Sequence, residues 1–158
     1  MRKIKFRGKR IDNGEWIYGN LIKNINEDTD EVRFFIIRNP RLTKDCGCCD
    51  SCECDYNCVG YIIEIKEETV GELTGLKDCI GKEAYRKDII NVFLKGENRI
   101  YKHLKNVTIE EENGAYGIYE RVGSFPSEKH FIPFCNFDFS VLEFEIIGNI
   151  YENPELLK

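Results

Sequence analysis

The stretch TVGELTGLKDCIGKEAYRKDIINVFL, residues 69–94, decides the fold of this chain. Its glycines Gly71, Gly75 and Gly81 mark positions where the backbone turns through positive φ or passes close to other backbone. The stretch ends in IINVFL, residues 89–94, an apolar run that predicts a buried or half-buried strand. The stretch therefore predicts strands joined by tight glycine turns.

Upstream, residues 3–11 alternate basic and apolar side chains, which is typical of a strand, and residues 15–22 return as a second strand. Between them, Asn13-Gly14 predicts a two-residue type I′ hairpin loop, with Lys9 opposite Tyr18. One face of the hairpin is then expected to hold the core side chains Ile4, Phe6, Ile17 and Leu21. The other, which we call the basic-aromatic face, holds Lys5, Arg7, Lys9, Trp16 and Tyr18.

Further short strands are predicted over residues 32–38, 61–66, 99–104, 107–112, 115–121 and 142–151. A second Asn-Gly pair, Asn113-Gly114, predicts a hairpin with Ile109 opposite Ile118. Helical periodicity is almost absent, apart from one turn expected after Asn153. The fold class is therefore mainly β, and the strand lengths favour a barrel or small sandwich. We divide the chain into a hairpin unit, residues 1–66 with a cysteine-rich insertion at 41–60, and a second unit, residues 67–158.

Three motifs carry a family resemblance: KFRGKRIDNGEWIYGNLI (5–22), TVGELTGLKDCIGKEAYRKDII (69–90) and IIGNIYENPELL (146–157). Together, and in this order, they resemble the YopX family of bacteriophage and prophage proteins. The resemblance implies a phage or prophage origin and a second half similar to an SH3-like barrel, and it implies no particular biochemical activity. The chain has Ile80-Gly81 where an Asn-Gly turn is expected, and Lys87-Asp88 where Gly-Asp is expected. Isoleucine and lysine both disfavour positive φ.

Charge and hydropathy limit the classes of partner. The net charge of −5 argues against nucleic-acid binding by the whole surface, although residues 1–25 carry seven Lys or Arg against two acidic residues. No apolar run approaches the roughly 18 residues of a membrane span, and no apolar segment follows the basic start. We therefore expect no membrane association and a cytoplasmic location, in a bacterial host cell if the resemblance holds.

Six of the eight cysteines lie within residues 46–58. In a reducing compartment such a cluster is more typical of metal ligands than of disulfides. One zinc ion held by four thiolates is the candidate arrangement, with the ligands Cys46, Cys49, Cys54 and Cys58. Metal would order a long polar loop that has no apolar core. A metal-free reduced loop and disulfides stay open as alternatives, because several of the cysteine spacings are too short for standard zinc knuckles.

No hydrolase, kinase, nucleotide-loop or deaminase signature is present, so we expect no enzyme activity. The leading hypothesis is a non-enzymatic protein that binds a host or phage macromolecule. The alternative is a nucleic-acid-binding module in which Lys5, Arg7 and Lys9 contact phosphates and Trp16 or Tyr18 stacks on a base. A third interpretation is that the cationic side chains cover the two rings and the face packs on the rest of the chain or on another subunit.

Overall fold

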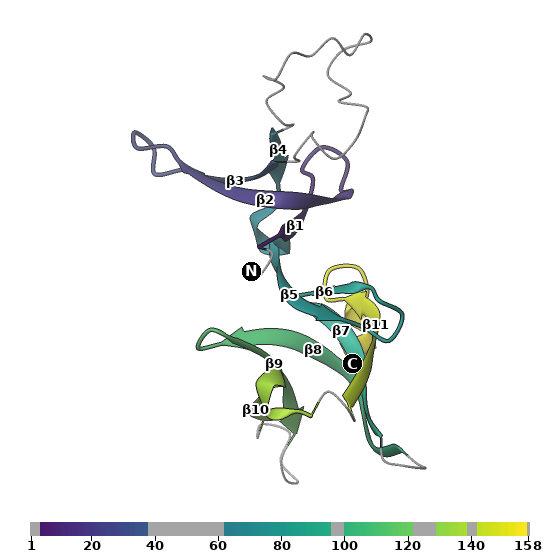
Figure 1. Ribbon diagram of the computed structural model, residues 1–158. Helices are drawn as coiled ribbons and strands as arrows, with labels where there is room; N and C mark the ends of the chain where they lie inside the picture. Colours follow the sequence, from purple (N-terminus) through teal and green to yellow (C-terminus); the bar gives the residue numbers. More distant parts are fainter. Residues whose placement is uncertain (1–3, 38–61, 96–99, 122–128, 139–141, 158) are drawn as a thin grey trace, which may run out of the picture. The chain divides into compact units, whose positions relative to one another are not determined.

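The computed structural model describes residues 4–37, 62–95, 100–121, 129–138 and 142–157 (Figure 1). The described chain is mainly β with antiparallel sheets, as predicted, and its helical elements are short 3₁₀ turns. It divides into two compact units between Glu72 and Leu73, and we describe each unit by itself. The boundary predicted after residue 66 falls at the start of the 3₁₀ turn η2 (Glu67–Thr69) and stays a prediction. No helix among the described residues is long and apolar enough to cross a membrane.

The N-terminal unit is one antiparallel sheet in the strand order β4-β3-β2-β1. Its strands are β1 (Phe6–Lys9), β2 (Trp16–Ile25), β3 (Val32–Ile37) and β4 (Ile62–Ile65), and β2 and β3 form the long hairpin in Figure 1. The first residues of β5 (Gly71–Lys77) pair with the other side of β1. The ends of β1 and β4 lie next to each other. There Arg10 and Ile65 form an isolated antiparallel β-bridge, and the Lys66 amide donates a hydrogen bond to the Lys9 carbonyl over 2.8 Å.

The predicted register of the first hairpin is wrong by two residues. Tyr18 lies opposite Arg7 rather than Lys9, and Trp16 lies opposite Lys9. The loop has four residues, 11–14, because the Arg10 amide donates to the Glu15 carbonyl over 3.0 Å. Of Asn13 and Gly14, only Gly14 has positive φ, so the turn is not type I′.

Local polar contacts stabilise the four-residue loop. The Asn13 side chain accepts a hydrogen bond from the Glu15 amide over 3.0 Å, and the Arg10 guanidinium donates to Asp12 over 2.8 Å. The Gly14 amide donates back to the Arg10 carbonyl over 3.1 Å.

The register of the hairpin differs from the predicted one by two residues. Because this shift is an even number of residues, every strand side chain keeps its predicted face.

The core of the N-terminal unit is small. Ile17, Ile36 and Ile65 are buried, and Leu21, Phe34, Ile63 and Val70 pack partly buried against them. Ile17 and Leu21 were predicted to belong to this core. Ile4 was predicted to join them, but it precedes β1 and is 65% exposed.

The C-terminal unit contains the remainder of β5, which pairs with β6 (Glu83–Tyr85), and a five-stranded antiparallel sheet in the order β10-β9-β8-β7-β11. The strands of this sheet are β7 (Asp88–Lys95), β8 (Ile100–Glu112), β9 (Ala115–Arg121), β10 (Lys129–Pro133) and β11 (Leu142–Asn149). Two strands predicted over 99–104 and 107–112 are a single strand, β8, whose pairing is irregular near Asn106, a residue with a φ of 54°. The described strands do not close into a barrel.

The core of the C-terminal unit is larger. Its buried members come from β6, β7, β8, β9, β11 and η3 (Phe134–Asn136): Ala84, Ile90, Val92, Ile109, Ile118, Phe134, Leu142, Phe144 and Ile146. Ile90 and Val92 belong to the apolar run predicted as a strand at residues 89–94.

The second hairpin prediction is confirmed. Ile109 lies opposite Ile118, and Asn113 and Gly114 form a two-residue loop with φ of 52° and 78°. Positive φ at both positions is the backbone of a type I′ turn, which matches the twist of the flanking strands. The turn predicted after Asn153 is the 3₁₀ turn η4 (Pro154–Leu157).

Lys87 adopts the left-handed conformation that its side chain disfavours, with a φ of 72°. Tertiary contacts hold it there. Its amide donates to the Ile109 carbonyl over 2.9 Å, and its own carbonyl accepts from the Ile150 amide over 3.1 Å. Its ammonium group lies 2.6 Å from the Glu110 carboxylate. At the other departure from the family pattern, Gly81 alone takes positive φ, so Ile80 avoids the strain.

Candidate macromolecule-binding face

The sheet of the N-terminal unit places all five side chains of the basic-aromatic face together. Cations lie over both rings. The Arg7 guanidinium carbon is 4.8 Å and the Lys9 ammonium nitrogen 5.4 Å from the centre of the Trp16 ring. The Lys5 ammonium nitrogen is 5.2 Å from the centre of the Tyr18 ring. Each such contact is worth about 0.5–1 kcal/mol at an exposed site and more where water is excluded.

The five side chains differ in how much solvent they meet. Arg7 is 6% exposed, which makes it a buried member of the face, whereas Tyr18 is 42% exposed. Lys5, Lys9 and Trp16 are half-buried. Tyr18 is therefore the ring most accessible to a partner, and Lys5 and Lys9 are the more accessible cations.

Thr69 fixes the position of β1 beneath the face. Its hydroxyl oxygen accepts a hydrogen bond from the Lys9 amide over 2.8 Å and donates to the Lys66 carbonyl over 2.7 Å. Thr69 is 3% exposed, so these bonds are shielded from water. Only the Lys9 backbone is held in this way, and its side chain remains over the Trp16 ring.

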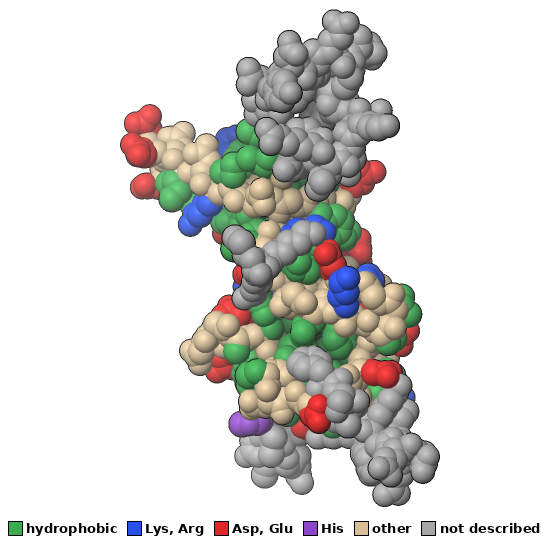
Figure 2. All heavy atoms as spheres, viewed as in Figure 1, with side chains coloured by type: hydrophobic (Ala, Val, Ile, Leu, Met, Phe, Trp, Pro, Cys, Tyr) green, Lys and Arg blue, Asp and Glu red, His purple; other side chains and the backbone are tan. Residues whose placement is uncertain are grey.

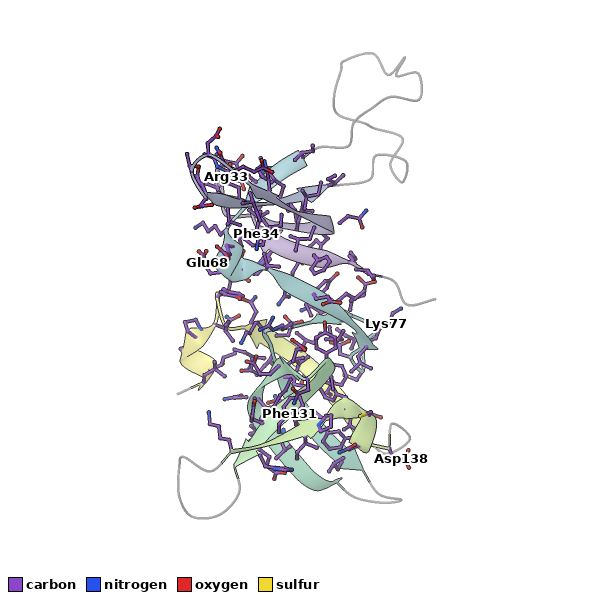
Figure 3. All side chains as sticks on the ribbon, turned by 90° about the vertical axis from the view of Figure 1, so that its left-hand side faces the viewer. Arg33, Phe34, Glu68, Lys77, Phe131 and Asp138 are labelled. Atoms are coloured by element: carbon purple, nitrogen blue, oxygen red, sulfur yellow. The ribbon has the colours of Figure 1, made fainter. Side chains whose placement is uncertain are left out.

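The same face continues across β2 and β3. Ile22, which is 37% exposed, lies opposite Phe35, and Asn24 lies opposite Arg33. Phe34 neighbours Arg33 on β3 (Figure 3). Because side chains alternate along a strand, it lies on the opposite face, where the Lys23 ammonium nitrogen is 5.9 Å from the centre of its ring. The face thus has a cationic-aromatic end on β1 and β2, and on β2 and β3 it continues through two apolar side chains, Ile22 and Phe35, into polar ones.

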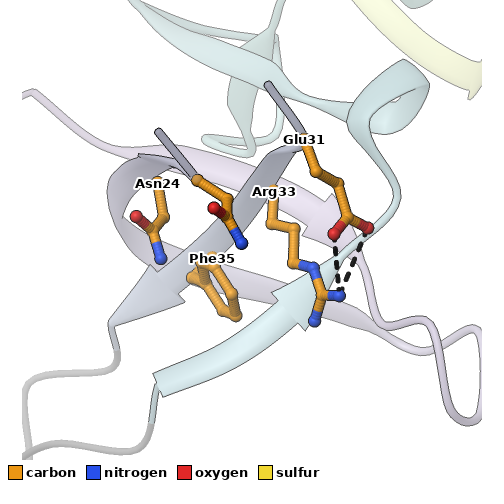
Figure 4. A pocket seen from close by; sticks show the side chains of 5 residues that line it. Asn24, Glu31, Arg33 and Phe35 are labelled. Atoms are coloured by element: carbon orange, nitrogen blue, oxygen red, sulfur yellow. Dashed lines mark hydrogen bonds and ion pairs between the residues drawn. The ribbon is translucent and has the colours of Figure 1, made fainter. Parts of the chain in front are cut away.

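A small pocket of about 270 Å³ lies on the β2 and β3 part of the face (Figure 4). Asn24, Asn26, Glu31, Arg33 and Phe35 line it. The Arg33 guanidinium donates to both carboxylate oxygens of Glu31, over 3.1 and 3.2 Å, and this hydrogen bonding raises the pKa of Arg33 above its ordinary value. The pair is about half exposed, so it contributes little to stability, but it holds the Arg33 guanidinium in the lining of the pocket that Phe35 shares.

Acidic side chains gather at the turn between β2 and β3, just beyond the pocket (Figure 2). They are all exposed: Glu27, Asp28, Asp30 and Glu31. The face is therefore basic at one end and acidic at the other. A polyanion is favoured only at the basic end.

The predicted zinc ligands Cys46, Cys49, Cys54 and Cys58 lie outside the described residues, so the zinc site stays a prediction. Cys79 and Cys135 are described, and both are exposed thiols. No cluster of three or more His, Cys, Asp or Glu suited to a metal ion occurs in the described parts of the chain.

Two buried carboxylates, Asp78 and Asp88, form turns, a role that no sequence motif predicted for them. Asp78 accepts hydrogen bonds from the amides of Ile80 and Lys82, over 3.1 and 2.8 Å, and Asp88 accepts from the Tyr85 amide over 2.8 Å. Asp78 is 7% and Asp88 2% exposed. Both residues lie in the second motif of the family resemblance, beside residues predicted to form turns. That position is the sequence signal from which their turn-forming role could have been predicted.

The comparison with protein-family models agrees with the three motifs. The model of the YopX protein family matches residues 5–158. The chain belongs to the YopX family. A comparison with curated proteins finds no match. Among solved structures, this YopX family member is similar to the crystal structure of protein EF1440 from Enterococcus faecalis, with 20% identity, a TM-score of 0.39 and full coverage of both chains.

Proposed function

We propose that this YopX family member is a non-catalytic accessory protein of phage or prophage origin, which binds a host or phage protein in the bacterial cytoplasm. The observation that supports the proposal is the half-exposed face on which cations cover the Trp16 and Tyr18 rings. Aromatic residues and arginine are enriched in protein interfaces. The apolar continuation through Ile22 and Phe35 and the acidic turn beyond it suit a protein surface better than a polyanion.

Capture of a partner from host lysate tests this proposal, with nuclease added. We expect the full chain to retain one stoichiometric protein and the Tyr18→Glu variant to lose it, because the glutamate places a charge among the contacts of the exposed ring. Ile80→Glu is the matched control, since Ile80 is exposed (82%) and lies in the other unit. With the purified partner, Tyr18→Glu should weaken binding at least tenfold, which is about 1.4 kcal/mol.

Two results would contradict the proposal. One is a partner that Tyr18→Glu and the parent protein bind equally well, with circular dichroism showing both folded. The other is the recovery of no stoichiometric protein once nuclease is present.

Single-stranded nucleic acid is the second candidate partner. The alternation of β1 places Lys5, Arg7 and Lys9 in a row beside two rings, and this specific observation favours it. A row of cations follows a phosphate backbone, while an exposed ring such as Tyr18 stacks on a base for about 1–3 kcal/mol.

The salt dependence of binding tests the second candidate. Lys5→Gln with Lys9→Gln should flatten the plot of log affinity against log salt by about 1.4, because two phosphate contacts are lost at roughly 0.7 each for a single strand. Lys77→Gln with Lys82→Gln removes the same charge from exposed positions elsewhere and should leave the slope within about 0.3 of the parent value. Equal slopes in the two double variants, or no binding at low salt, would exclude this role for the face.

We further propose an SH3-like barrel over residues 67–158, which the family resemblance implies. A zinc ion bound by Cys46, Cys49, Cys54 and Cys58 is proposed as well. We also propose self-association through the basic-aromatic face as an alternative to binding a different protein. Sedimentation of the purified chain measures its oligomeric state and, alongside the capture experiment, distinguishes the two.

A further inference from the structure

A groove of about 630 Å³ lies in the C-terminal unit, against β8, β9, the start of β10 and the turn η4. Its volume is in the range of natural ligand sites, roughly 300–1,000 Å³. Leu104, Val107, Leu156 and Leu157 contribute apolar side chains, and Leu157 is 44% exposed. The Tyr119 ring, 39% exposed, adds an aromatic surface and contacts the Phe131 ring at a centroid distance of 5.3 Å.

One of the two carboxylates that line the groove is paired with a cation. The Glu110 carboxylate lies 2.6 Å from the Lys87 ammonium group, and Glu120 makes an interaction of its own. By contrast, neither Lys105 nor Lys129 has a carboxylate within 4 Å among the described residues, although both are exposed in the groove. Lys105 and Lys129 are therefore the cations of the groove that an anionic ligand can reach.

We propose that this groove binds an acidic peptide segment that carries an aliphatic side chain beside its carboxylates. The carboxylates pair with Lys105 and Lys129, and the aliphatic group packs on Leu156, Leu157 and the Tyr119 ring. A nucleic acid would match the lysines but would leave the leucines without an apolar partner. The site is separate from the basic-aromatic face, and it does not depend on the function proposed for that face.

Selection from a random peptide library against the full chain tests the proposal. We expect the enriched peptides to place Asp or Glu next to Leu, Ile or Val. Binding of a fluorescein-labelled enriched peptide should weaken at least tenfold in Lys105→Glu with Lys129→Glu, and about three- to tenfold in Leu157→Ser. Lys77→Glu with Lys82→Glu makes the same change of charge at exposed lysines outside the groove and should bind within twofold of the parent.

Tyr18→Glu serves as a second control, because it should bind the peptide as the parent does whether or not the basic-aromatic face is functional. The proposal is overturned if no peptide is enriched, if the enriched peptides lack acidic residues, or if the two lysine double variants bind equally. A labelled oligothymidine is the comparison probe. The proposal is also overturned if the groove variants bind this oligothymidine more weakly than the parent does but bind the peptide as well as the parent does. Thermal unfolding of each variant shows whether a loss of binding reflects a loss of the fold.

Discussion

Replacing Gly8 with alanine is expected to lower the free energy of unfolding of the N-terminal unit by about 1–3 kcal/mol. Gly8 is buried in β1, and a Cβ built at this position would overlap the Ile65 side chain, with the Ile65 Cδ1 atom as its nearest neighbour. Ile65 is 2% exposed, and its backbone is held by the bridge to Arg10. The added methyl group therefore overpacks a small core that has little room to adjust.

Ile65→Val should restore part of this loss, because valine lacks the Cδ1 atom that the new methyl group meets first. Alone, Ile65→Val should cost about 0.5–1.5 kcal/mol. The double variant should be more stable than the sum of the two single changes predicts. Urea unfolding followed by the fluorescence of Trp16, the single tryptophan of the chain, measures all three variants. Strict additivity would show that Gly8 and Ile65 do not meet as described.

Gly19→Ala is the matched comparison in the neighbouring strand. A Cβ at Gly19 would overlap the backbone carbonyl oxygen of Ile37, as well as a methyl group of Ile36. A backbone oxygen in a paired strand has less freedom to move than the end of a side chain. Gly19→Ala should therefore destabilise at least as much as Gly8→Ala, and Ile65→Val should not rescue it.

Asp78→Ala is expected to destabilise the C-terminal unit by about 2–4 kcal/mol, because a hydrogen bond to a charged group contributes roughly 1.5–3 kcal/mol and the contributions of bonds to one carboxylate do not add. One oxygen of the Asp78 carboxylate accepts from the amides of Ile80 and Lys82, and the other from the Ile146 amide over 3.4 Å. The side chain thus closes the turn between β5 and β6 and connects it to β11. In the same place, the Cys79 amide donates to the Phe144 carbonyl over 2.9 Å.

Asp78→Asn separates the two roles of this carboxylate. The amide oxygen of asparagine can still accept from Ile80 and Lys82, but its NH₂ group would face the Ile146 amide donor. The loss should therefore be smaller than for alanine, about 1–2 kcal/mol, and hydrogen exchange should accelerate at Ile146 more than at Lys82. Thermal unfolding gives the stability difference. An Asp78→Ala protein within about 0.5 kcal/mol of the parent would contradict the structural role, since that is the range of ordinary surface changes.

Local chemistry determined much of this fold, and it could be predicted from the sequence. Asn113-Gly114 specifies a type I′ turn because both residues tolerate positive φ, and the pairing of Ile109 with Ile118 follows from that turn. Strand alternation likewise assigned the five side chains of the basic-aromatic face to one side. That assignment survives the wrong register, because a shift of two residues leaves every side chain on its face.

Tertiary contacts decided the rest. Asn13-Gly14 has the same turn signal as Asn113-Gly114, yet its loop has four residues. There the β-bridge of Arg10 with Ile65 and the hydrogen bond from the Ile11 amide to the Glu64 carbonyl connect the start of the loop to a distant strand. Lys87 takes positive φ against its own preference, because its amide and carbonyl are bonded to residues far along the chain. The burial of Arg7 within the candidate face also appeared only in the folded chain. Turn preferences act within a few residues, whereas hydrogen bonds and packing between distant strands outweigh them wherever the two disagree.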